Sequence, residues 1–281
     1  MALPSYAGPL ERTWYYTFRI ICAAVFIFLI APILIIVPLS FNAEPYFSFT
    51  QGMLTLDPDA FSLRWYETFL TSDRWMNSIQ NSIIVAFFST FFSAVLGTLA
   101  ALGLSRSELP FKGVIMGLLI SPMIVPLIIA AAGMFFFYSK LGISQTYVGL
   151  IMAHTALGTP FVVITVTATL SNFDHTLVKA GASLGATPTY TFFKVTMPLI
   201  MTGIISGALF AMMTSFDEVI VAIFIAGVEQ RTIPLQMWAG IREQISPTIL
   251  AVATILITFS IIMLSTVEIL RRRSDRIRGI S

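Results

Sequence analysis

Long runs of apolar residues, separated by shorter polar stretches, dominate this sequence. A helix needs about 20 predominantly apolar residues to cross the hydrocarbon core of a bilayer, and six runs meet that length. The pattern therefore predicts an all-α membrane protein with six transmembrane helices. We expect these helices at about Tyr15–Ser40, Ile79–Leu104, Gly113–Tyr138, Tyr147–Leu170, Pro198–Ala226 and Ile249–Leu270.

The first apolar run predicts a retained helix. It is longer than the apolar region of a secretory signal, and no small-residue cleavage site follows its end, LIIVPLSFN. Residues 1–14 then form an N-terminal tail, and residues 15–40 form the first transmembrane helix.

Basic residues set the expected orientation, because cytoplasmic loops are enriched in Lys and Arg. The strongest contribution is the basic tail at 271–281, with its run RRRSDRIR. With the N-terminus inside, the cytoplasmic side also holds Arg12, Arg19, Arg106, Lys112, Lys179 and Lys194, and the outer side holds Arg64, Arg74, Lys140, Arg231 and Arg242. Both termini are therefore predicted to be cytoplasmic.

The composition of the chain excludes several classes of protein. The chain is 57% hydrophobic and 11% charged, with a mean hydropathy of +0.88, whereas soluble domains carry about a quarter charged residues. The net charge of +2 forms no patch suited to nucleic acid. One cysteine and two histidines exclude a disulfide framework and a zinc cluster.

Several motifs of catalysis are also missing from the sequence. It contains no GxxxxGK[ST], HExxH or GxGxxG. We therefore expect no enzymatic activity, no cofactor and no metal in this chain.

Residues 41–76 form the longest predicted extramembrane piece, with Pro, aromatic residues and acids. One interpretation is an amphipathic connector on the membrane surface, with Trp65 and Tyr66 at the headgroup level. The other is part of a docking face for an external protein.

The segment between the fourth and fifth runs is too polar to lie in lipid. Its pattern predicts a short helix from Thr176, a break at Gly185 and the following Ala-Thr-Pro, and a second short helix from Pro188 to about Val195. Small residues in the first helix let another surface approach its backbone closely. The segment is either a rigid elbow that docks into a partner or a simple connection between spans.

The same residues resemble the cytoplasmic EAA loop of permease subunits of binding-protein-dependent ABC importers. That motif reads Glu-Ala-Ala, three residues, Gly, nine residues, Ile, one residue, Leu, Pro. In this chain the Gly falls on Gly185, the Ile on Val195, the Leu on Met197 and the Pro on Pro198, while the Glu position holds Lys179. A lysine there favours an acidic or carbonyl-lined partner surface.

The resemblance covers about residues 77–270, including NSIIVAFFSTFFSAVLGTLAALGLSR, GTPFVVI and SFDEVIVAIFIAG, and is strongest to spermidine/putrescine-type permeases. It implies a type I importer permease core at 77–270 in a bacterial inner membrane, with a coupling loop at 176–198. It implies as partners a second homologous permease, two copies of a cytoplasmic ATPase that binds ATP and Mg, an external solute-binding protein and a small solute. The residues implied to couple to the ATPase are Lys179, Ala180, Gly181, Ala182, Ser183, Leu184, Gly185, Ala186 and Pro198.

The solute is expected to be a polyamine or a related cationic compound, although related importers carry opines, phosphonates or iron. Asp217 and Glu218 are the only adjacent acids within an apolar run. Either they line the route for a cation, or they cap a helix break or pair with Arg231. His154 is a further route candidate, with hydrogen-bonded packing as its alternative.

Two other functions compete with the importer subunit. A stand-alone secondary transporter would need coupled intramembrane charges and usually an inverted repeat, and the sequence has one acidic pair and no such repeat. A scaffold or insertion-type membrane protein is the other alternative.

Overall fold

The computed structural model describes residues 8–105, 109–171, 173–174, 176–243 and 246–277. The chain divides into two compact units, Met1–Phe69 with Ile245–Leu256, and Leu70–Gln244 with Ile257–Ser281. Within the described residues, five helices are long and apolar enough to cross a membrane, or six if one bent pair counts as a single span. The predicted all-helical membrane architecture is confirmed.

In the first unit, α1 (Pro9–Leu39) leads into a small folded connector that contains α2 (Gln51–Leu54), a 3-10 helix (Pro58–Ala60) and the beginning of α3 (Arg64–Thr71). The side chain of Asn42 is buried and organises this connector. It donates to the carbonyls of Tyr46 and Ser48 and accepts the N–H of Glu44. The indole N–H of Trp65 donates to the Asn42 carbonyl. The one polar group of this side chain is therefore hydrogen-bonded inside the connector.

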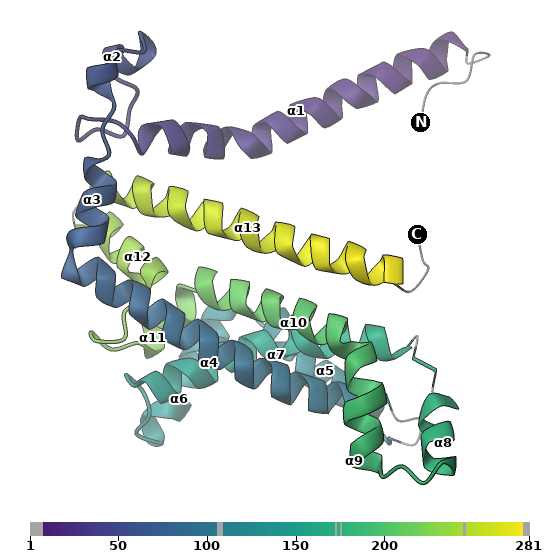
Figure 1. Cartoon of the computed structure of the whole chain (residues 1–281). Coiled ribbons are helices and arrows are strands. Elements are labelled where there is room, and N and C mark those ends of the chain that lie inside the picture. The colour runs from purple at the N-terminus through teal and green to yellow at the C-terminus, as the bar shows by residue number, and fades with distance from the viewer. Residues whose placement is uncertain (1–7, 106–108, 172, 175, 244–245, 278–281) are drawn as a thin grey trace. The chain divides into compact units, whose positions relative to one another are not determined.

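In the second unit, α4 (Asp73–Leu104), α7 (Tyr147–Ser171) and α10 (Met197–Asp217) pack against one another (Figure 1). Small residues bring their backbones close. A Cβ on Gly207 of α10 would lie 2.6 Å from the Cα of Val162, and one on Gly158 of α7 would lie 2.9 Å from the Cβ of Ala211. Gly203 likewise faces Thr169, so the GIISG segment packs against α7 of the same chain.

The third apolar run differs from the single helix expected at Gly113–Tyr138. It forms α5 (Lys112–Ile124) and α6 (Leu127–Lys140), which are bent by 102° at the break between them. Val125 precedes Pro126 and has ψ of 135°, because the proline ring disfavours a helical conformation in the residue before it. The helix therefore ends at Ile124 and restarts after the proline.

The fifth apolar run also breaks. After α10 ends at Asp217, a short helix α11 (Ile220–Ile225) follows and packs against α6. Next comes α12 (Ile233–Glu243), which contacts α4 and α10, and then α13 (Thr248–Ile277). The residues of α13 up to Leu256 belong to the first unit, and those from Ile257 on belong to the second. In Figure 1, α6, α11 and α12 lie at one end of the α4–α7–α10 group, and α8 (Thr176–Ser183) and α9 (Pro188–Thr191) project from the other end.

Candidate functional site: the elbow between two spans

The first arm of the elbow at 176–198 is α8, and it ends in a Schellman motif. The Ala186 N–H donates to the Gly181 carbonyl at 3.0 Å, and the Gly185 N–H donates to the Ala182 carbonyl at 3.0 Å. Gly185 has φ of +80°, a left-handed conformation that glycine adopts without the penalty of a Cβ. Glycine at this position therefore fixes where the first arm stops and where the chain turns.

The second arm is α9, and the residue that caps its start, Thr187, lies two residues after Gly185. The Thr187 hydroxyl accepts the N–H of Tyr190 at 3.3 Å, and Pro188 is the first residue of α9. Threonine before a helix and proline in its first turn are both favoured, because the first N–H groups of a helix lack partners within it. The sequence Gly-Ala-Thr-Pro thus encodes the end of one helix and the start of the next.

The second arm then continues into the membrane span without a break. After α9 comes a π-helix, Phe192–Thr196, and α10 follows directly, so that Pro188–Asp217 forms one helix of 30 residues. The sequence led us to expect a span that starts at Pro198. Proline has no N–H to donate one turn back, and the wider π turn immediately before it carries the helix past this point.

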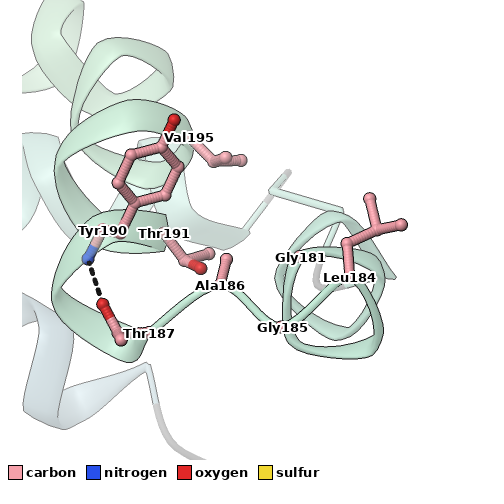
Figure 2. A pocket seen from close by; sticks show the side chains of 8 residues that line it. All are labelled: Gly181, Leu184, Gly185, Ala186, Thr187, Tyr190, Thr191 and Val195. Atoms are coloured by element: carbon pink, nitrogen blue, oxygen red, sulfur yellow. Dashed lines mark hydrogen bonds between the residues drawn. The ribbon is translucent and has the colours of Figure 1, made fainter.

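A notch with a volume of about 570 Å³ separates the two arms (Figure 2). Gly181 brings α8 close to α9, since a Cβ there would lie 3.1 Å from the Thr191 hydroxyl. Leu184 and Tyr190 stand on opposite sides of the notch (Figure 2), and both are exposed. The notch is lined by Gly181, Leu184, Gly185, Ala186, Thr187, Tyr190, Thr191 and Val195.

Almost the entire surface of α8 is exposed. Seven of its eight residues are exposed, and Gly181 alone is partly covered. Helices shorter than about 12 residues are marginal in water without tertiary packing. The first arm therefore presents a surface that a partner can cover, and its one charged side chain is Lys179.

Most of the residues expected to couple to an ATPase lie together here. Lys179 to Ala186 occupy α8 and the turn after it. Pro198 lies apart from them in the chain, in the first turn of α10. Their coupling role stays a prediction, which the geometry makes specific enough to test.

The two acids at the end of α10 have different surroundings. Glu218 is 7% exposed, and its carboxylate accepts the N–H of Val221 at 2.7 Å in the first turn of α11. Asp217 is exposed. Glu218 therefore stabilises the helix break, and Asp217 is the acid of this pair that is free to meet a solute.

His154 lies inside the helix group. It is 2% exposed, and its Nδ1 is 2.8 Å from the Ser215 hydroxyl of α10, which in turn accepts from Ser89 of α4 at 3.3 Å. Among the described residues nothing pairs with its Nε2. The side chain links three helices, and a solute would reach it only if these helices separated.

Sequence reasoning missed Asn81, which joins the ends of several elements. Its amide donates to the carbonyls of Glu229 at 2.7 Å and Arg231 at 2.9 Å, and its oxygen accepts from the Tyr147 hydroxyl at 2.6 Å. Ser82 beside it accepts the N–H of Ile233 at 2.8 Å. The available signal was a set of small polar residues on one face of an otherwise apolar helix, Ser78, Asn81, Ser82, Ser89 and Ser93.

Comparison with known proteins identifies a family of transport proteins and several relatives. The model of the family described as binding-protein-dependent transport system inner membrane component matches residues 93–276. A spermidine/putrescine transport system permease of Haemophilus influenzae is 29% identical over 251 residues, which cover 89% of this chain and 95% of that protein. A putrescine transport system permease of Escherichia coli K12 is 30% identical over 240 residues, covering 83% of this chain and 82% of that protein.

Solved structures share the fold. A chain of a bacterial ABC transporter involved in the import of the acidic polysaccharide alginate matches with a TM-score of 0.72 at 16% identity, covering 94% of this chain and 99% of that chain. A chain of the MetNI methionine ABC transporter matches with a TM-score of 0.50 at 20% identity, covering 75% of this chain and all of that chain.

The fold and the family model define the class as the permease component of an ABC importer. The chain belongs to the family of binding-protein-dependent transport system inner membrane components. It is a multi-pass permease of the inner membrane. In these systems a separate subunit hydrolyses ATP, so this chain is not itself an enzyme, and it belongs to a permease family without cofactors.

Proposed function

We propose that this permease carries a polyamine or a related small cationic solute and forms half of the pathway. The names of its relatives support the solute class, since permeases for spermidine/putrescine and for putrescine are 29–30% identical to it over more than four fifths of its length. Asp217 supports the same class, because an exposed carboxylate at the end of a membrane helix attracts a cation.

The other half of the pathway is a second, homologous but different permease. Two copies of an ATPase drive the pair from the cytoplasm, and an external solute-binding protein delivers the solute. A solved alginate transporter has been seen in complex with an alginate-bound periplasmic protein, and assembly of that general kind is what we propose here.

One observation carries the coupling proposal. The elbow combines an exposed first arm with a second arm that continues as the membrane helix α10. An ATPase that grips the first arm moves α10 with it, because no flexible joint lies between Pro188 and Asp217. ATP-driven motion then reaches the helix break beside Glu218.

The experiment is reconstitution of the complete transporter in proteoliposomes with its binding protein. We expect spermidine or putrescine to raise ATP turnover and to accumulate inside, and an opine, a phosphonate or an iron complex to do neither. Stimulation by one of these other solutes would replace the polyamine. Uptake by this chain alone, without an ATPase, would instead identify a stand-alone secondary transporter.

A further inference from the structure

The charge of the elbow has a single sign. Its only ionic side chains are Lys179 and Lys194, and the sequence holds no Asp or Glu between 175 and 216. Asp174, which precedes α8, accepts hydrogen bonds from the backbone N–H and the hydroxyl of Thr176. Among the residues that the structure describes, no carboxylate lies within ion-pair distance of Lys179.

The position of Lys179 makes this charge part of the docking surface. Gly181 faces Thr191 of the second arm, and Lys179, two residues before it, lies about 160° around the helix axis from it. The ammonium group is therefore on the side of α8 that turns away from the rest of the chain. A partner that covers α8 must cover this charge as well.

Covering a charge is unfavourable unless an opposite charge or hydrogen-bonding groups replace its water. We propose that the groove which receives α8 is acidic, with a carboxylate of the partner ATPase opposite Lys179. This inference rests on the proposed coupling function and adds the sign of the contact, which is the reverse of that expected from the glutamate in the related motif. The apolar side chains of Leu177 and Val178 in α8, and of Leu184 in the turn after it, are all exposed and supply the remaining contact area.

Charge substitution at this position tests the proposal. The permease pair is placed in lipid nanodiscs, and binding of the ATPase recovered with the wild-type complex is measured at low and high salt. We expect Lys179→Arg to bind like wild type, Lys179→Gln to bind about threefold more weakly and Lys179→Glu about tenfold more weakly, with both losses reduced at high salt.

Lys194→Glu is the matched control, because Lys194 is exposed in the same elbow but lies in the second arm. A much smaller loss for Lys194→Glu than for Lys179→Glu supports a local carboxylate opposite Lys179. Equal losses for the two variants, or unchanged or tighter binding of Lys179→Glu, would overturn the acidic groove. In each of these cases the ATPase still binds and the proposed function stands, whereas failure of the wild-type pair to bind it at all would remove that function.

Discussion

Asp217 and Glu218 are neighbours in sequence, but only one of them faces outward. From the sequence, we expect the two acids either to attract a cation or to stabilise a helix break. In the structure the two acids have different surroundings, since Glu218 accepts the N–H of Val221 within the fold and Asp217 is exposed. One substitution at each position therefore distinguishes solute binding from folding.

For Asp217→Asn we expect a KM for spermidine about tenfold higher in proteoliposomes, with normal assembly, because a charge-assisted contact with the solute is lost. For Glu218→Gln we expect a lower thermal stability of the purified complex and little change in KM, because the buried cap weakens. Uptake of spermidine and unfolding temperature are measured for both variants. An unchanged KM in Asp217→Asn would exclude this residue from the solute pathway.

At the level of elements, much of the elbow could be predicted from the sequence. Glycine, threonine and proline in Gly-Ala-Thr-Pro each act on the local backbone, so a short pattern fixes both helix ends. The path of the chain at Pro198 could not be predicted. Proline is compatible both with the start of a helix and with a position after a π turn inside a longer helix, and the local sequence does not distinguish the two. The same holds for Val125 and Pro126, where the sequence predicts one continuous span and the structure has a bend of 102°.

Hydrogen bonds between residues far apart in the chain could not be predicted either, because their partners are set by tertiary packing. Asn81 is one polar residue on a mostly apolar helix, and its partners lie 66, 148 and 150 residues away in the chain. A local pattern shows that such a residue must be satisfied when buried, but it does not show by which group. The same limit applies to His154 and Ser215, whose pairing joins α7 to α10.

Substitutions at Gly185 test whether the turn between the two arms of the elbow contributes to coupling. A Cβ at this position would meet nothing within 4 Å, so the constraint is the left-handed backbone and not space inside the chain. We expect Gly185→Ala to destabilise the turn by about 1 kcal/mol and to lower the uptake obtained per ATP hydrolysed. Gly185→Asn should perturb coupling less, since asparagine tolerates this conformation, although its side chain is larger.

The measurement is the ratio of spermidine uptake to ATP hydrolysis in the reconstituted transporter. If Gly185→Asn uncoupled the complex more strongly than Gly185→Ala, size at the partner surface would be the cause. Normal coupling in both variants would show that the turn has no part in transmission.

At the largest scale, the second unit connects the exposed first arm of the elbow to a helix break near the opposite end of the bundle (Figure 1). The helix from Pro188 to Asp217 has 30 residues and spans about 45 Å at 1.5 Å per residue. Gly203 and Gly207 hold it close to α7, so a displacement of the arm is transmitted along a packed helix. The proposed coupling therefore requires a fixed direction of the arm relative to the span.

Insertion of one alanine between Thr196 and Met197 tests this transmission. The extra residue rotates the elbow by about 100° relative to α10 and leaves both parts otherwise intact. We expect the ATPase to remain bound and to hydrolyse ATP at its basal rate, while stimulation by the solute-loaded binding protein and uptake of spermidine are lost. The control is one alanine inserted between Leu109 and Pro110, before α5 and outside the helix from Pro188 to Asp217, which should preserve coupling. Full uptake in the Thr196–Met197 insertion would mean that motion reaches the pathway by another route, because a rigid helix cannot absorb a rotation of this size.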